Sequence, residues 1–221
     1  MEEGEVRSPL SGTPQGGVLS PLLSNLYLHE LDKRMSRSDG KLIRFADDLV
    51  MLCSSSGQAK RALEKMRTIL NGLGLTVNET KTRIGHVREG FDFLGFTYRE
   101  AYSTRQGRLV RVKYPRAKSV RAIQQRIKAT IQAVGLGAAF SEVITAVNRK
   151  LRGWANYFRV GNSYAAALEL NAYVCEQLRI WWRRRKQNKR IRGGRAWANA
   201  FFYRQGLAYL PALVRGGANA A

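Results

Sequence analysis

Two adjacent acids interrupt an apolar run in the stretch Arg44-Phe45-Ala46-Asp47-Asp48-Leu49-Val50-Met51-Leu52. Apolar residues lie on both sides, Leu42-Ile43 before and Leu49 to Leu52 after, so the pattern predicts strand, tight turn, strand. Such a hairpin holds neighbouring carboxylates at its tip, where hard divalent cations find oxygen ligands. Two metal ions there can clamp the attacking and leaving oxygens of a phosphoryl transfer. The alternative is an ordinary solvated Asp-Asp turn, and this motif alone does not decide between them.

The positive charge of the chain is concentrated in its second half. The 221 residues carry 38 Lys and Arg against 16 Asp and Glu, a formal net charge of +22. Residues 1–100 hold 14 of the basic and 13 of the acidic side chains, so residues 101–221 hold the remaining 24 and 3. A one-sided basic field attracts polyanions, and the interleaved Trp and Tyr residues favour nucleic acid as the partner. A ribosomal-type or merely soluble basic surface, or binding to acidic lipids, is the alternative.

The cysteines indicate neither a disulfide framework nor a zinc site. Cys53 and Cys175 are the two cysteines, far apart and without a Cys-x-x-Cys partner. A reducing compartment is therefore expected. It is the bacterial cytosol, where the protein is either free or associated with the nucleoid, or the interior of an organelle. No apolar run approaches membrane-spanning length, so no membrane partner is expected, while 44% hydrophobic residues are enough for a folded core.

Four blocks, in order and spacing, resemble the reverse transcriptases that bacterial and organellar group II introns encode. Their residues are Gly12 to Leu28 (GTPQGGVLSPLLSNLYL), Phe45 to Asp48, Gly74 to Asn78 with Lys81-Thr82, and Phe93 to Phe96. Two later segments, Leu151 to Phe158 and Trp181 to Arg185, are similar to the maturase-specific part of those proteins. The resemblance covers nearly the whole chain, and its four ordered blocks are more specific than any one of them.

The resemblance implies RNA-directed DNA polymerase chemistry with magnesium at the hairpin. It makes Asp47 the primary metal ligand and Asp48 the auxiliary one, and it places Phe45 beside the nucleotide or the primer end. The implied partners are an RNA template with a DNA primer, together with intron RNA whose splicing the protein assists.

The other polymerase blocks supply further candidate contacts by resemblance. Pro14, Gln15 and Gly16 line the template and nucleotide site, where bare backbone lets a base approach closely. Lys81 lies near the triphosphate, and Gly95 lies in a turn that grips the primer end. The structural alternatives are plain helix-start geometry for the glycine block and a solvated loop position for the lysine.

The first part of the chain is predicted to be a partial palm over residues 1–114. A helix from about Leu19 to Met35 is expected to bury one broad apolar face that includes Leu22 and Leu26. A second helix spans Ala59 to Leu70, and Gly74 is expected to open the next strand. A basic hairpin, with strands Phe96 to Tyr102 and Leu109 to Val112, precedes a domain boundary near Pro115.

Residues 115–221 are predicted to form an α-helical thumb and maturase domain, which makes the whole chain α+β. Three helices are expected, over Lys118 to Val134, from Ser141 and from Ser163. The second should bury Ile144, Val147, Leu151, Trp154 and Phe158, and the third Tyr164, Leu168, Cys175, Leu178 and Trp182. Trp154 and Trp182 are therefore expected in the core rather than as RNA stacking platforms. Residues 197–213 are expected to close the bundle as a strand pair or a short helix.

RNA binding is assigned to exposed cations of this second half, because arginine forks pair with phosphates and stack on bases. The candidates are Arg149, Lys150, Arg152, Arg183, Arg184, Arg185, Lys186, Lys189 and Arg190.

The family's metal site needs a further aspartate on an earlier palm strand, and no such motif precedes Gly12 here. Half of an electrostatic clamp should lose most of its catalytic power, so we expect weak or no polymerase activity from this chain alone. A separate N-terminal half or a second protomer is then the expected partner. Three hypotheses stay open: a complemented reverse transcriptase, a non-catalytic RNA-binding maturase module, and a truncated remnant.

Overall fold

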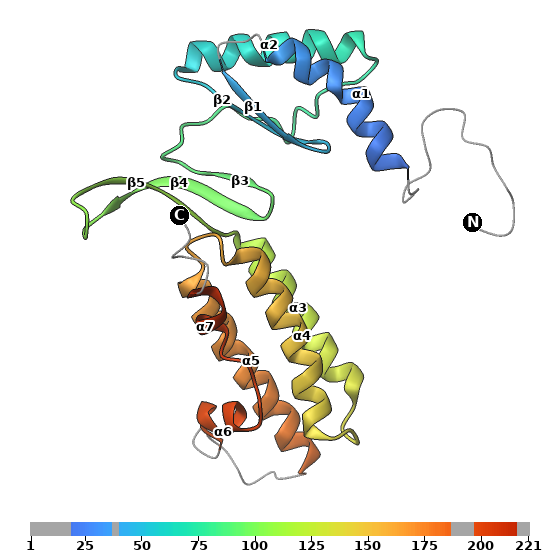
Figure 1. Cartoon of the computed structure of the whole chain (residues 1–221), viewed down its shortest axis with the longest axis vertical. Coiled ribbons are helices and arrows are strands. Elements are labelled where there is room, and N and C mark those ends of the chain that lie inside the picture. Colours follow the sequence, from blue (N-terminus) through green and yellow to red (C-terminus); the bar gives the residue numbers. More distant parts are fainter. Residues whose placement is uncertain (1–18, 37–39, 187–196, 216–221) are drawn as a thin grey trace, which may run out of the picture. The chain divides into compact units, whose positions relative to one another are not determined.

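The chain folds into helices and two small antiparallel sheets, an α+β arrangement shown in Figure 1. The computed structural model describes residues 19–36, 40–186 and 197–215. The chain divides into two compact units, residues 1–85 (the first unit) and residues 86–221 (the second unit). The basic hairpin therefore groups with the helices that follow it, although the predicted domain boundary lies near Pro115.

The first unit contains two helices and one hairpin. They are α1 Ser20–Met35, β1 Lys41–Phe45, β2 Asp48–Leu52 and α2 Ser56–Gly72. The two strands pair antiparallel with Phe45 opposite Asp48, which confirms the predicted strand, turn, strand. The N-terminus of α2 is capped by Ser55, whose hydroxyl accepts a hydrogen bond from the Gln58 N–H at 3.2 Å.

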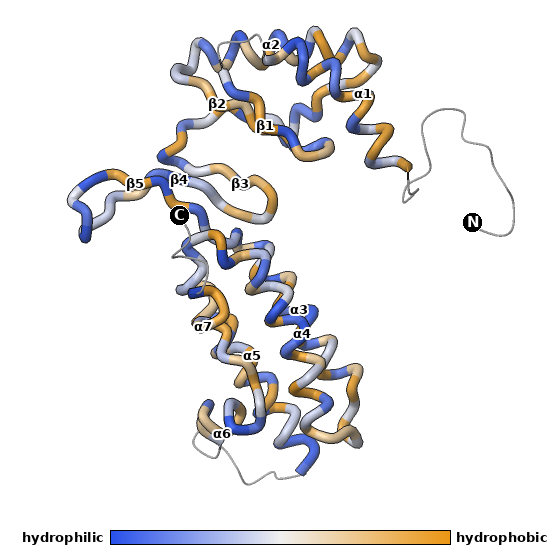
Figure 2. The backbone as a smooth tube through the Cα atoms, viewed as in Figure 1, coloured by the Kyte–Doolittle hydropathy of each residue, from blue (hydrophilic) through white to orange (hydrophobic). Residues whose placement is uncertain are grey.

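Only the C-terminal half of α1 is buried in the first unit. Leu31 and Met35 are fully buried against α2, whereas Leu22 and Leu26 are 65% and 71% exposed. Figure 2 shows apolar residues in orange along α1 toward its N-terminal end. The prediction of one broad buried face is wrong for these turns, because periodicity shows that a face is apolar but not that another element covers it.

The strand predicted to open at Gly74 is also wrong. Residues 73–90 contain no strand, and Gly74 has a positive φ of 69°. The Leu75 N–H donates back to the Leu70 carbonyl at 2.9 Å, and the N–H groups of Lys81 and Thr82 donate to the Asn78 carbonyl. These local turn bonds use the N–H groups that a strand would offer to a neighbour.

The second unit contains a three-stranded sheet and five helices within the described part of the chain. They are β3 Phe91–Phe93, β4 Phe96–Ser103, β5 Arg108–Pro115, α3 Ala117–Val134, α4 Phe140–Phe158, α5 Tyr164–Arg185, α6 Asn199–Arg204 and α7 Leu210–Arg215. The sheet has the order β3-β4-β5 with antiparallel pairing throughout. The predicted hairpin and the three long helices are confirmed, and two short helices follow residue 197.

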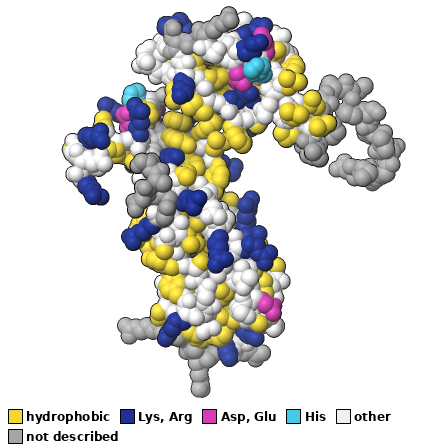
Figure 3. Space-filling model, in the orientation of Figure 1, with side chains coloured by type: hydrophobic (Ala, Val, Ile, Leu, Met, Phe, Trp, Pro, Cys, Tyr) yellow, Lys and Arg dark blue, Asp and Glu magenta, His cyan; other side chains and the backbone are white. Residues whose placement is uncertain are grey.

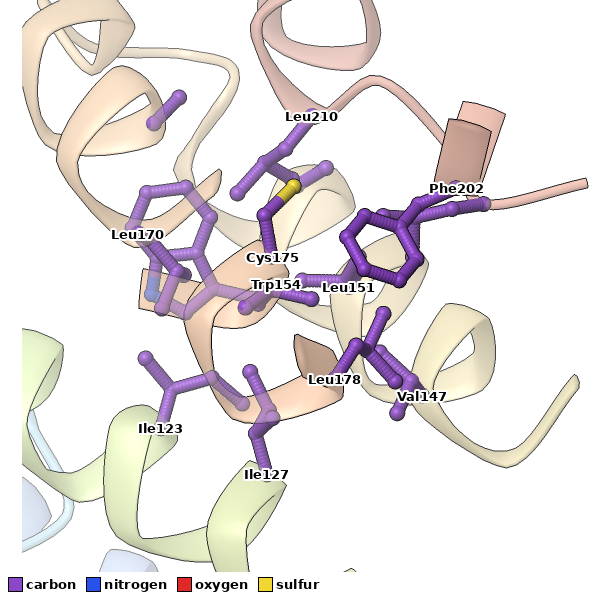
Figure 4. Close-up of a cluster of buried hydrophobic side chains, with 14 of the residues drawn as sticks. Ile123, Ile127, Val147, Leu151, Trp154, Leu170, Cys175, Leu178, Phe202 and Leu210 are labelled. Carbon is purple, nitrogen blue, oxygen red and sulfur yellow. The ribbon is translucent and has the colours of Figure 1, made fainter. Parts of the chain in front are cut away.

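The core of the second unit lies among α3, α4, α5 and the two short helices, as Figure 4 shows. The predicted face of α4 is confirmed, since all five of its residues are buried. On α5, Cys175 and Leu178 are buried as predicted, but Tyr164 and Leu168 are exposed, and the core face also includes Leu170, Val174 and Trp181. Trp154 is buried as predicted, and Trp182 is partly buried against the same core. No described helix is both long and apolar enough to cross a bilayer.

Candidate functional site

The Asp-Asp hairpin has the shortest common connection, a two-residue turn. Ala46 and Asp47 form the turn between the paired residues Phe45 and Asp48. Ala46 has a positive φ of 53°, which the tight hairpin turns require and which costs an L-residue about 1–2 kcal/mol. Both carboxylates are exposed at this end of the hairpin.

Arg44 braces the strained turn against α1. Its Nε and one terminal nitrogen donate to the two Asp32 carboxylate oxygens at 2.9 and 2.5 Å, a bidentate pair. The other terminal nitrogen donates to the Ala46 carbonyl at 3.0 Å and to Asn25 Oδ1 at 3.1 Å. The Arg44 side chain is only 10% exposed, so one guanidinium joins the turn to two positions of α1.

This pairing also shifts the acidity of both groups. The hydrogen bond from the Arg44 guanidinium is the main cause that holds the pKa of the Asp32 carboxyl below its usual range. The same bond raises the pKa of Arg44. The sequence did not predict the role of Asp32, because no spacing rule links residues 32 and 44. The only available signal was an arginine in a strand next to two acids, which indicates that this arginine needs an acidic partner.

The two hairpin carboxylates form a donor pair rather than a complete metal cage. Among the described residues, no group of three or more His, Cys, Asp and Glu side chains lies together. Protein-bound Mg²⁺ is usually held by one or two carboxylates plus substrate phosphates and waters, rather than by a complete protein cage. Asp47 and Asp48 supply such a donor pair and have no ion pair with another described residue.

The other polymerase candidates fall in three different places. Phe45, 64% exposed, lies on β1 directly opposite Asp48. Lys81 is exposed in the turn after Asn78. Gly95 has a positive φ of 77° and belongs to the second unit, whereas the Asp-Asp hairpin belongs to the first. Pro14, Gln15 and Gly16 lie outside the described residues.

Several predicted RNA-binding cations are exposed on the helices of the second unit. Arg149, Lys150 and Arg152 are exposed on α4 without an ion pair to any residue that the structure describes. Arg184 and Lys186 are exposed at the end of α5, and the Lys186 Nζ lies 5.7 Å from the centroid of the Trp182 ring. Figure 3 shows dark-blue Lys and Arg side chains over this unit, where magenta acids are few.

Two other members of the predicted run have structural contacts. Arg185 lies with its guanidinium 5.2 Å from the centroid of the Trp181 ring and donates to the Ala138 carbonyl. Arg183 lies 3.6 Å from the carboxylate of Glu176. Arg183 and Arg185, predicted as exposed cations, are instead half-buried: Arg185 contacts the α3–α4 connection, and Arg183 pairs with Glu176 of its own helix. Lys189 and Arg190 lie outside the described residues.

Comparison with protein families gives two matches. The family described as reverse transcriptase (RNA-dependent DNA polymerase) matches residues 1–98. The family described as group II intron, maturase-specific domain matches residues 120–200. The first match contains the Asp-Asp hairpin, and the second contains the exposed cations of α4 and α5.

Curated relatives resemble the chain over different lengths. The group II intron-encoded protein LtrA of Lactococcus lactis subsp. cremoris is 24% identical over 263 aligned positions, which span 80% of this chain and 44% of that protein. Protein YkfC of Escherichia coli (strain K12) is 32% identical over 130 residues, 43% of this chain and 34% of that protein. An uncharacterized 91 kDa protein in a cob intron of Schizosaccharomyces pombe is 27% identical over 38% of this chain. The chain spans less than half the length of each.

Proposed function

The chain belongs to the group II intron reverse transcriptase and maturase family, and from that premise we propose that it takes part in RNA-directed DNA synthesis and binds intron RNA to assist splicing. The observation that carries the proposal is the Asp47-Asp48 hairpin, braced by Arg44, in one chain with a basic helical unit. In this proposal β1, β2 and α2 belong to a polymerase palm, and α3 to α5 form the thumb and maturase domain.

The hairpin residues are proposed to hold magnesium together with the incoming nucleotide. Asp47 is the primary ligand and Asp48 the auxiliary one; when bound, the ion supplies electrostatic stabilisation of the transferring phosphoryl group. Arg44 keeps the turn in its strained conformation, so the two carboxylates need little reorganisation to bind. Phe45 offers an exposed ring beside the nucleotide, and Lys81 offers a positive charge to the triphosphate.

The helical unit is proposed to bind intron RNA through its phosphates. Arg149, Lys150, Arg152, Arg184 and Lys186 are exposed on α4 and at the end of α5, two helices that share one hydrophobic core. If about six to ten cations contact phosphate, affinity should fall by about 10³- to 10⁵-fold between about 50 and 200 mM salt. Arg183 and Arg185 are weaker candidates for RNA binding, because their side chains already contact Glu176 and Trp181.

Primer extension on an RNA template with Mg²⁺ tests the polymerase part. The parent chain, alone and with a separately supplied N-terminal palm half, is compared with Asp47→Asn, which keeps the size and the turn preference of the aspartate. Glu89→Gln serves as the matched control, since Glu89 is an exposed acid outside the hairpin. We expect extension to be lost in Asp47→Asn and kept in Glu89→Gln. Equal extension by the parent and Asp47→Asn would refute the assignment of the hairpin.

A second candidate function is an RNA-binding maturase module that makes no DNA. The observation that favours it is the charge distribution, since residues 101–221 hold 24 of the 38 basic and 3 of the 16 acidic side chains. This candidate predicts salt-dependent RNA binding that Asp47→Asn leaves unchanged and that falls when Arg149, Lys150 and Arg152 are all replaced by Ala. Binding without extension, in the same samples and with the supplied half present, would favour this candidate over the first.

A further inference from the structure

The turn between β3 and β4 has a conformation that one of its two residues, Leu94, disfavours. Leu94 and Gly95 have φ of 48° and 77°, as a two-residue turn of this hairpin type requires. Glycine adopts a positive φ freely, but a leucine there costs about 1–2 kcal/mol. Contacts from outside the turn must therefore hold it.

Both carbonyl groups of the turn accept hydrogen bonds from the helices. The Tyr157 hydroxyl of α4 donates to the Leu94 carbonyl at 2.9 Å. The Ser119 hydroxyl and the Arg116 N–H, at the start of α3, donate to the Gly95 carbonyl at 3.1 and 3.0 Å. The turn is thus connected to two helices at two successive peptide groups.

The N–H of the Leu94–Gly95 peptide points to the side opposite the Tyr157 contact. In a trans peptide the N–H points away from the preceding carbonyl, so the Gly95 N–H points away from the Tyr157 hydroxyl. Neither the Leu94 nor the Gly95 N–H donates a hydrogen bond to any residue that the structure describes. The helices therefore fix the two turn carbonyls, while the Gly95 N–H, on the far side of one of those peptides, and the Leu94 N–H of the preceding peptide have no partner among the described residues.

Tyr157 is not needed to fill the core. Its side chain is 53% exposed, while its ring stacks on Phe96 at a centroid distance of 5.7 Å and meets the edge of Phe158 at 4.9 Å. A phenylalanine would make the same ring contacts, so the hydroxyl adds only the bond to Leu94. Tyr157 lies in the stretch from Leu151 to Phe158, within the match to the maturase-specific family.

We propose that Tyr157 is a positioning residue that holds the Leu94-Gly95 turn against the primer strand of a bound primer–template duplex. Its hydroxyl, with that of Ser119 in support, fixes the strained turn before the duplex binds. The maturase-specific helix thereby sets the conformation of a polymerase contact. This inference rests on the proposed function, because that function supplies the primer.

Photo-crosslinking tests the inference on the full chain. A DNA primer with 4-thiothymidine at its 3′ end is annealed to an RNA template, irradiated with the protein, and the crosslinked peptide is identified by mass spectrometry. We expect the parent to crosslink within residues 93–96, and Tyr157→Phe to lower that yield about fivefold, the effect of losing one neutral hydrogen bond. Tyr102→Phe is the matched control, because Tyr102 is a 64% exposed tyrosine on β4 whose hydroxyl has no hydrogen-bond partner among the described residues.

If Tyr157 only stabilised the fold, its replacement would lower the affinity for single-stranded RNA together with the crosslink yield. The proposal predicts a different result. Tyr157→Phe should keep the parent's affinity for single-stranded RNA, and Ser119→Ala should lower the crosslink yield in the same direction. An unchanged yield in Tyr157→Phe, an equal fall in Tyr102→Phe, or a parallel loss of single-stranded RNA affinity would each overturn the inference. A parent that extends primers but does not crosslink at this turn would overturn the inference alone. A parent without any RNA binding would refute the proposed function as well.

Discussion

Gly161 and Gly153 provide a pair of substitutions for which the structure predicts opposite effects on stability. Gly161 follows α4, beside Asn162, whose N–H donates to the Lys113 carbonyl on β5 at 2.7 Å. A Cβ at Gly161 would lie 2.8 Å from that carbonyl oxygen and 2.9 Å from Cε1 of Phe96. Neither neighbour can move easily, because the carbonyl is part of the backbone and the Phe96 ring is 5% exposed.

We therefore expect Gly161→Ala to lower the free energy of unfolding of the second unit by about 1–3 kcal/mol, the usual cost of overpacking. Gly153 lies on the exposed side of α4, and a Cβ there would meet nothing within 4 Å. Gly153→Ala should raise stability by about 0.5–1 kcal/mol, since alanine loses less backbone entropy in a helix.

Denaturant titration followed by tryptophan fluorescence measures both variants. The four tryptophans, Trp154, Trp181, Trp182 and Trp197, all lie in the second unit, so the signal reports on that unit. Gly161→Ala should unfold at lower denaturant than the parent, and Gly153→Ala at higher. A Gly161→Ala variant as stable as the parent would refute the close approach of β5 and the α4–α5 connection. A Gly153→Ala variant destabilised as much as Gly161→Ala would show that the effect is not one of packing.

Three further expectations concern the core, the hairpin brace and the end of α5. Leu151→Ala should cost about 2–5 kcal/mol in the same titration, because the side chain is fully buried; a cost below about 1 kcal/mol would contradict that burial. The folded pKa of Asp32 lies below its unfolded value of about 3.9, so its contribution is complete above that value and is lost as pH falls through the folded pKa. The protection factors of the β1 amides, which are exchange rates corrected for their intrinsic pH dependence, should therefore fall on acidification in the parent and change less in Asp32→Asn; the same change in both would argue against the brace. Arg185→Ala should lower the stability of the second unit while Arg184→Ala should not, and the reverse order in denaturant titrations would contradict the Trp181 contact.

Local patterns account for the parts of the fold that were predicted correctly. The hairpin around Asp47 follows from two apolar runs separated by a short polar step, and its pairing needs only neighbouring residues. The buried face of α4, through Leu151 and Trp154, follows from helical periodicity. Both patterns involve residues that are close together in the sequence, so the sequence alone is enough to predict them.

The failures on α1 and α5 have one physical cause, which is that an apolar helical pattern does not specify which neighbour covers it. Leu22 and Leu26 form an apolar stripe on α1 that the first unit leaves exposed. On α5 the core face passes through Trp181 rather than Trp182, because α3 and the C-terminal helices set the rotation of that helix. The segment after Gly74 has strand-like residues but folds back on Leu70 and Asn78.

The sequence by itself determined the long helices and the two predicted hairpins, the segregation of charge and the residue types that suit metal and RNA chemistry, because these depend on neighbouring residues and on composition. The tertiary structure alone decided which side chains act together: Arg44 with Asp32, Arg185 with Trp181 and Ala138, and Tyr157 with Leu94, 63 positions away. A hydrogen bond or ion pair forms only where folding brings donor and acceptor to about 3 Å, and no local pattern encodes that distance.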